Sequence, residues 1–136
     1  DLQIKSGNSI LDNSNNIIRI FNKVNISLLE ENDSYLITDS LIWNLNSSKI
    51  NLDNPLEINI KNSKVSSSNG IYNINSGILN INDNIFYKDI YSKKGEKEYQ
   101  IKIISDNAKW FKNDNSIEFS SDNNQVETTI DFLSIK

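Results

Sequence analysis

Residues 43–58 read WNLNSSKINLDNPLEI. Trp43 is followed seven and nine residues later by the apolar pair Ile50 and Leu52, and a polar run separates the tryptophan from this pair. Two more apolar residues follow at offsets of thirteen and fifteen, namely Leu56 and Ile58. Within each expected strand the offsets share parity, which places the apolar side chains on one face. The stretch therefore predicts a strand, a tight turn and two further strands with an apolar face.

The same spacing occurs in three more places. The other sets of anchor and pair are Leu11, Ile18 and Ile20; Tyr72, Leu79 and Ile81; and Trp110, Ile117 and Phe119. The fifth residue after the anchor, in the middle of a polar run, is Asn16, Ser48, Gly77 and Asn115 in the four sets. Asparagine and glycine readily adopt the positive φ that a tight turn needs. A recurrence this regular predicts about four copies of one supersecondary unit stacked on each other.

The four copies are not identical. At offsets thirteen and fifteen, the first and third copies hold Val24, Ile26, Ile85 and Tyr87. In the fourth copy these offsets fall on Asn123 and Gln125, and Val126 follows, which predicts a one-residue insertion or a bulge. The segment KDIYSKKGEKEY (88–99) predicts a protruding hairpin with its tip at Lys93–Lys97, which is either a contact site or a solvated turn.

The composition favours strands over helices. The chain holds 24 Asn and 23 Ile but one Ala, one Arg and no Met, and no stretch has a sustained apolar period of 3.6 residues. Codon bias in an AT-rich genome accounts for the Asn and Ile excess without a function. The Asn runs lie between alternating apolar residues, which argues against prion-like disorder. We therefore expect an all-β chain of about 10 to 14 short strands, folded as a single domain over residues 1–136.

Several classes of function are disfavoured by what the chain lacks. There is no His and no Cys, so the usual general base, the commonest metal ligand and thiol chemistry are missing. A net charge of −4 argues against a nucleic-acid partner. Asp39 and Asp106 both stand four residues before an anchor, but Gly7 and Ser68 occupy the same offset, so repeat equivalence explains the coincidence. We expect no enzyme, no cofactor and no metal site, because the Asn and Asp runs lack a calcium-loop pattern and are typical of turns.

The segment TDSLIWNLNSSKINLDNPLEI (38–58) resembles the lipopolysaccharide-transport proteins of the LptC, LptA and OstA-N group. Their pattern is an aromatic anchor, a polar turn, an apolar pair and a "GNVxI"-like strand. That strand stands here as FNKVNI (21–26), DNPLEI (53–58) and NDNIFY (82–87), without the glycine. KVSSSNGIYNINSGILNI (64–81) fits the same pattern, and the resemblance covers about residues 7–127. The TDSLIW run is more similar to LptC than to LptA.

This resemblance implies a β-jellyroll in which stacked antiparallel strands form an open V with an apolar interior. It implies a periplasmic protein that holds the lipid A acyl chains of lipopolysaccharide in this groove and passes the lipid on without bond chemistry. The implied partners are other jellyroll proteins of the transport bridge, an inner-membrane ABC transporter and further copies of the chain. Because the chain begins at Asp1 and has no apolar run of roughly 20 residues, we expect that a signal peptide or a tethering membrane helix preceded it.

The wall of the groove is expected to consist of apolar residues of inward parity. They are Ile18, Ile20, Val24, Ile26, Leu41, Trp43, Ile50, Leu52, Leu56, Ile58, Tyr72, Leu79, Ile81, Ile85 and Phe119. For each of them an ordinary packed core is the alternative. Partners are expected to dock on the first strand, Leu2–Lys5, and the last, Val126–Ile135, since the end strands of a stack have unpaired backbone groups. The contact candidates are Leu2, Ile4, Val126, Thr128, Ile130 and Phe132.

Two other binding functions remain open from the sequence. A structural or adhesive β-repeat module of a surface or outer-membrane protein would have the same repeats around a closed core. A carbohydrate-binding jelly roll would use Trp43, Tyr72 and Trp110 as a flat platform. These anchors share the parity of the apolar pairs, so we expect them to point inward, which disfavours the platform.

Overall fold

The structure is a computed structural model that describes residues 2–28, 34–60, 63–91 and 99–132. This part of the chain contains twelve strands and no helix, and thus none long and apolar enough to cross a membrane. The strands are β1 (Leu2–Lys5), β2 (Asn8–Asp12), β3 (Ile17–Leu28), β4 (Ser34–Asn44), β5 (Lys49–Leu52), β6 (Leu56–Ile60), β7 (Ser63–Ser67), β8 (Asn69–Asn73), β9 (Ile78–Tyr91), β10 (Tyr99–Phe111), β11 (Ser116–Ser120) and β12 (Glu127–Phe132). They form one antiparallel sheet, which confirms the predicted all-β class.

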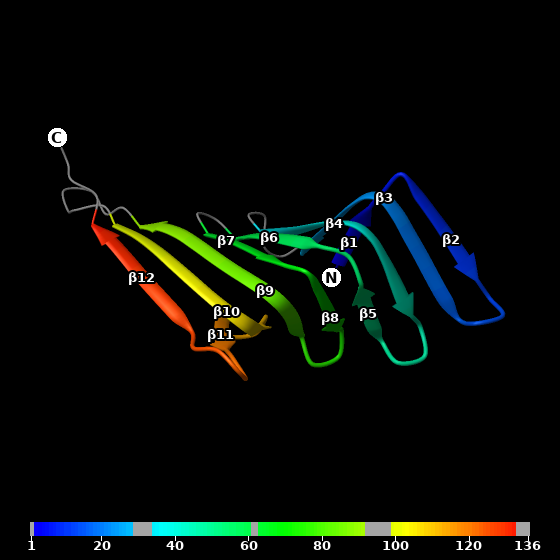
Figure 1. The fold of residues 1–136 in the computed structure, drawn as a ribbon. Helices are drawn as coiled ribbons and strands as arrows, with labels where there is room; N and C mark the ends of the chain where they lie inside the picture. The colour runs from blue at the N-terminus through cyan, green and yellow to red at the C-terminus, as the bar shows by residue number, and fades with distance from the viewer. Residues whose placement is uncertain (1, 29–33, 61–62, 92–98, 133–136) are drawn as a thin grey trace.

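The long strands β3, β4, β9 and β10 are shared by two layers. The halves of these strands next to the hairpin turns pair with β2, β5, β8 and β11 and make the turn layer. The other halves pair with β1, β6, β7 and β12 and make the opposite layer. In Figure 1 the stack runs from β2 at one end to β11 and β12 at the other, with the hairpin turns along the lower side of the view.

The chain passes from the turn layer to the opposite layer eleven and twelve residues after each anchor. We call the boundary between the two layers at these positions the fold line. β3 and β9 cross this line with positive φ at Asn22 and Lys23 and at Asp83 and Asn84. The register between β3 and β4 shifts at the same point. In the second unit the chain crosses between β5 and β6 at Pro55, where a missing N–H removes no strand bond. Asn and Asp enter the left-handed region more easily than most residues, so the sequence permits the sheet to bend here.

A hydroxyl residue stands five positions before every anchor, on the fold line: Ser6, Thr38, Ser67 and Ser105. Thr38, Ser67 and Ser105 are buried. The Thr38 hydroxyl donates to the carbonyl oxygen of Pro55 at 3.1 Å, and the Ser67 hydroxyl donates to that of Asn82 at 2.8 Å. Buried polar groups are tolerated when they are hydrogen-bonded. These hydroxyls therefore satisfy backbone carbonyls where the strands leave one layer for the other.

Each hairpin turn contains a residue of positive φ at the predicted fifth position. The values are 54° at Asn16, 55° at Ser48, 69° at Gly77 and 49° at Asn115. The carbonyl oxygens of the first three residues each accept a backbone N–H from the turn of the next unit, at 2.9–3.0 Å. The turns are thus hydrogen-bonded to each other along the stack as well as closed within themselves.

The strand register explains the spacing of seven residues. In every set the anchor lies directly opposite the first residue of its pair: Leu11 with Ile18, Trp43 with Ile50, Tyr72 with Leu79 and Trp110 with Ile117. Directly opposite residues project from the same face of a sheet and contact each other. The repeat in the sequence is therefore a row of cross-strand pairs on the inner face of the turn layer.

The fourth unit differs from the sequence-based expectation. Ile103 lies opposite both Tyr87 and Thr128, so Thr128 takes the place in its unit that Tyr87 has in the third. Tyr87 follows its anchor by fifteen residues and Thr128 by eighteen, so the insertion is three residues long rather than one. The predicted hairpin after β9 is supported by the pairing of Tyr91 with Tyr99, while its tip at Lys93–Lys97 lies outside the described residues.

Apolar side chains from both layers pack between them as one core. The largest fully buried side chains are Ile50, Leu52, Leu79, Ile81, Ile85, Val24 and Val65. They belong to strands between β3 and β9, so the dense part of the interior is the middle of the stack. Gly70 is required here, because a Cβ atom would lie 3.0 Å from both the Asn80 carbonyl oxygen and the Ile81 side chain.

Candidate functional site

The predicted wall residues all lie in the interior between the two layers. Eleven of the fifteen are buried, and the other four, Ile18, Ile26, Trp43 and Phe119, are partly buried and pack against that core. Their inward orientation follows from the register described above. Contact of these residues with lipid stays a prediction.

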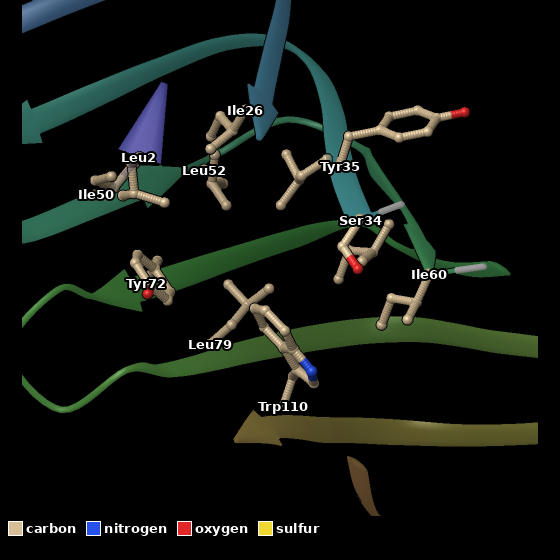
Figure 2. A pocket seen from close by; sticks show the side chains of 12 residues that line it. Leu2, Ile26, Ser34, Tyr35, Ile50, Leu52, Ile60, Tyr72, Leu79 and Trp110 are labelled. Atoms are coloured by element: carbon tan, nitrogen blue, oxygen red, sulfur yellow. The ribbon is translucent and has the colours of Figure 1, made fainter. Parts of the chain in front are cut away.

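The interior contains a small inner cavity of about 50 Å³ in the middle of the stack. It is lined by Leu2, Ile26, Ser34, Tyr35, Leu36, Ile50, Leu52, Ile58, Ile60, Tyr72, Leu79 and Trp110. Figure 2 shows Leu79 and Trp110 on one side of it and Ile26 and Ile60 on the other, while the ring of Tyr35 points away. An engineered apolar cavity of about 150 Å³ holds one benzene molecule, so the inner cavity has no room for an alkyl chain.

A second, larger space of about 300 Å³ lies at the end of the stack formed by β10, β11 and β12. This space, which we call the C-terminal bay, is lined by Ile60, Ser63, Tyr87, Ile101, Ile103, Asn115, Ile117 and Phe119. In the described part of the chain β11 and β12 each pair with β10 alone, so the stack ends here. On β12, Ile130 is 51% exposed and Phe132 is 74% exposed, which leaves apolar surface beside the bay uncovered.

Aromatic and polar groups both contribute to the bay. Tyr87 of the opposite layer contacts Phe119 of the turn layer edge to face, with ring centroids 5.5 Å apart, so the two layers touch here. The Tyr87 hydroxyl donates to Oδ2 of Asp89 at 3.1 Å and lies 3.3 Å from Oγ of Ser63. Burial is the main cause that raises the pKa of Tyr87, so the phenol stays neutral at physiological pH. The bay therefore combines a mostly apolar lining with the hydroxyl groups of Ser63 and Tyr87 and the side-chain amide of Asn115.

The bay was only partly visible in the sequence. Phe119 is the one bay residue among the predicted wall residues. Ile101 and Ile103 alternate with Lys102, which is the pattern of a strand with one apolar face. Ile117 is the seventh residue after Trp110 and so fits the spacing of the repeat. Periodicity indicates which face a residue is on, but the distance between the two layers, which decides whether a space remains, is not encoded in it.

The predicted partner edges correspond to the two ends of the opposite layer. Among the described residues, β1 pairs with β3 alone and β12 with β10 alone, so both are edge strands. Leu2 and Ile4 pack against the core. Thr128, Ile130 and Phe132 belong to β12 and are exposed.

One edge residue is placed differently from the prediction. Val126 precedes β12, which begins at Glu127, because the three-residue insertion delays the strand. The described part of β12 ends at Phe132, so the predicted continuation to Ile135 lies outside the described residues. The edge carries few charges: Glu127 is exposed, and Asp131 lies 4.0 Å from the ammonium group of Lys102.

The two carboxylates at equivalent offsets do not form a pair. Asp39 is on β4 and Asp106 on β10, and four strand spacings separate these strands in either layer, or about 19 Å. The carboxyl groups of glycosidases lie about 5 to 10 Å apart. Within the described ranges no three His, Cys, Asp or Glu residues are grouped so that they could hold a metal ion.

Comparison with known proteins gives a likeness of fold. No family model matches the chain, and no curated protein sequence matches it. A solved structure that does match is that of LptH from Pseudomonas aeruginosa, described as the LptA-homologous periplasmic component of a conserved lipopolysaccharide transport device. The TM-score is 0.63 at 10% sequence identity, over 100% of this chain and 96% of LptH. This chain has the LptA-like β-jellyroll fold. The fold expected from the segment at 38–58 is thereby confirmed.

Proposed function

We propose that this chain is a periplasmic component of a lipopolysaccharide-transport bridge. As a single β-jellyroll domain it would shield acyl chains of lipopolysaccharide between its two layers and pass the lipid to the next jellyroll. The sugars and phosphates would stay in water. No bond is made or broken in this function, so it needs no catalytic residue, and the energy would come from ATP hydrolysis by an inner-membrane transporter.

The C-terminal bay is the observation that carries this proposal. Its lining is mostly aliphatic and aromatic, and it has about 300 Å³ of space. The exposed Ile130 of β12 lies directly opposite Ile101, which lines the bay. Each buried methylene group contributes about 0.8 kcal/mol, so even a short stretch of acyl chain would bind here favourably. The LptA-like fold supports the same function by analogy.

Assembly through the strand edges would make the apolar interior continuous between molecules. β1 and β12 have one free side each within the described residues, and both belong to the opposite layer. Addition of a strand from another jellyroll, or from a second copy, would satisfy their unpaired backbone groups. Whether the neighbours are those of an LptC or of an LptA stays a prediction, and the sequence favours the LptC-like set.

A second function is favoured by one observation. Ile50 and Leu52 have no exposed surface, and the inner cavity between the layers is small. A closed interior of this kind is what a structural or adhesive β-repeat module requires. In that case the C-terminal bay would be covered by the next module of the same protein rather than by lipid.

The two functions are separated by titrating the chain with purified lipopolysaccharide. Ile103 lines the bay and is partly buried, whereas its neighbour Ile104 is on the other face and is 49% exposed. We expect Ile103→Asp to weaken binding at least tenfold, because a carboxylate in an apolar site is unfavourable. Ile104→Asp should bind as the wild type does. Absence of binding to the wild type, or equal losses in both variants, would favour the closed module.

A further inference from the structure

We propose that Trp110 divides the apolar interior and sets how far an acyl chain can insert from the C-terminal bay. This inference rests on the proposed function. Trp110 lines the inner cavity, while Ile117, its cross-strand partner, lines the bay. Ile60 of the opposite layer lines both spaces. The boundary between the two spaces therefore lies between the Trp110–Ile117 pair of the turn layer and Ile60 of the opposite layer, which Figure 2 shows on the other side of the inner cavity from Trp110.

The indole is held at this boundary by its surroundings. Trp110 is 7% exposed, and its Nε1–H donates to Oδ1 of Asn115 at 3.4 Å. Asn115 is the positive-φ residue of the last hairpin turn and also lines the bay. A buried indole usually has a partner for its N–H, and this one is supplied by a conformationally restricted turn. The equivalent residue of the second unit, Trp43, is only partly buried.

The sizes of the two spaces define what the bay can take. The bay spans the adjacent strands β6, β7, β9 and β10, which is about 14 Å at the usual strand spacing. Beyond Trp110 the inner cavity of about 50 Å³ is too small for an alkyl chain. The bay thus fits the end of one acyl chain, whose polar head would remain near the hydroxyls of Ser63 and Tyr87.

A boundary at Trp110 predicts how the binding affinity depends on the length of the acyl chain. Methylene groups that enter the bay gain burial, whereas a longer chain has to displace the indole, break its hydrogen bond and open the core. Affinity should therefore rise about fourfold for each added methylene and then stop rising once the bay is full. Removal of the indole should let longer chains continue to gain affinity.

The probe for this test is a series of uncharged 1-monoacylglycerols from octanoyl to hexadecanoyl, titrated below their micelle concentrations. We expect a break in the affinity series for the wild type and a break at a longer chain for Trp110→Ala. Phe111→Ala is the control, because Phe111 follows Trp110 on the opposite face of β10 and lines neither space, and it should keep the wild-type break. A series that rises to the longest chain in the wild type, or the same break in Trp110→Ala, would overturn the role of Trp110.

A second measurement needs no cavity-forming variant. In Trp43→Phe, Trp110 is the single tryptophan. A dodecanoyl chain brominated at its terminal carbon should quench the fluorescence of Trp110, and a chain brominated beside the head group should quench it much less. Equal quenching, or none while the lipid binds, would overturn the proposed boundary alone. If no member of the series binds, the proposed function fails as well.

Discussion

Leu52 has none of its surface exposed, and its side chain lies in the middle of the stack beside the inner cavity. Truncation to alanine removes buried methyl groups and leaves a cavity, so Leu52→Ala should lower the free energy of unfolding by about 2–5 kcal/mol. The control is Ile37→Ala, since Ile37 is 41% exposed. It should change stability by only about 0.5 kcal/mol. Urea denaturation measures both, and a small loss for Leu52→Ala would mean that the middle of the interior is open.

Ser48 is the one turn residue at the fifth position that is neither asparagine nor glycine. Its φ is 55°, in the region that costs an ordinary residue about 1–2 kcal/mol. Ser48→Gly should therefore raise the free energy of unfolding by up to about 1 kcal/mol, in part offset by the entropy of glycine in the unfolded chain. Ser47→Gly is the matched control, and it should lower stability. Thermal unfolding of the two variants decides, and a loss in both would contradict this assignment of strain.

Burial at equivalent positions depends on the neighbours of the residue as well as on its spacing. Leu11 has the same offset from its pair as Tyr72, but Leu11 is 57% exposed and Tyr72 is 9% exposed. Leu11 is on β2, the end strand of the turn layer, and lacks a neighbour on one side among the described residues. The sequence predicted the face on which each anchor lies, while its depth is set by its position in the stack.

At the scale of the single turn, Asp12 caps the first hairpin. Its carboxylate accepts the Asn15 side-chain amide at 2.9 Å and the N–H groups of Ser14 and Asn15 at 3.1 and 3.2 Å. The Asn15 side chain is the main cause that holds the pKa of Asp12 below its usual 3.8. Because the pKa of Asp12 is lower in the folded chain than in the unfolded chain, its ionised carboxylate stabilises the fold at any pH above the unfolded-state pKa. This stabilisation is lost as the pH falls through the folded-state pKa.

Asp12→Asn tests this contribution, because Asn44 and Asn73 cap the next two turns in the same way. The variant should keep the turn and remove the titration. We expect the stability of the wild type to fall relative to Asp12→Asn as the pH is lowered below about 4. Urea denaturation across that range measures the difference, and a difference that does not change with pH would contradict the role of Asp12.

The edge strand β12 can be tested with two adjacent prolines. Successive N–H groups of a strand point to opposite sides, so of Thr128 and Thr129 one donates toward β10 and the other toward the free edge. Proline at the inward position should lower the melting temperature. Proline at the outward position should weaken association with a partner or a second copy while the fold stays stable. Thermal unfolding measures the stability of the two variants, and sedimentation measures their association. Unchanged association in both variants would contradict docking on β12.

The turns and the strand faces could be predicted from the sequence where residues close together in the chain determine them. The turns follow from Asn16, Ser48, Gly77 and Asn115, and the inner face follows from parity. The length of the last insertion was not predictable, because Val126 looked like the next residue of the pattern and only pairing with β10 shows that Thr128 takes that place. The hydroxyls five residues before each anchor were a readable signal, but their role depends on a fold line that the sequence alone does not locate.

The whole molecule is asymmetric along the stack. The middle is closed around Leu52 and Leu79, and the end formed by β10, β11 and β12 contains the bay and exposed apolar residues. The stack as described therefore offers space for a chain at one end, while its centre is a buried core with a cavity of only about 50 Å³. Transfer through the full length of the interior would require the two layers to move apart at the position of Trp110.

The most direct test of the proposed function is in-cell photo-crosslinking with a reactive amino acid at Ile103, using Ile104 as the control. The two positions are adjacent isoleucines on opposite faces of β10, one lining the bay and the other 49% exposed. We expect a lipopolysaccharide adduct at Ile103 and none at Ile104. An adduct at neither position, or at both equally, would contradict the claim that acyl chains bind between the layers.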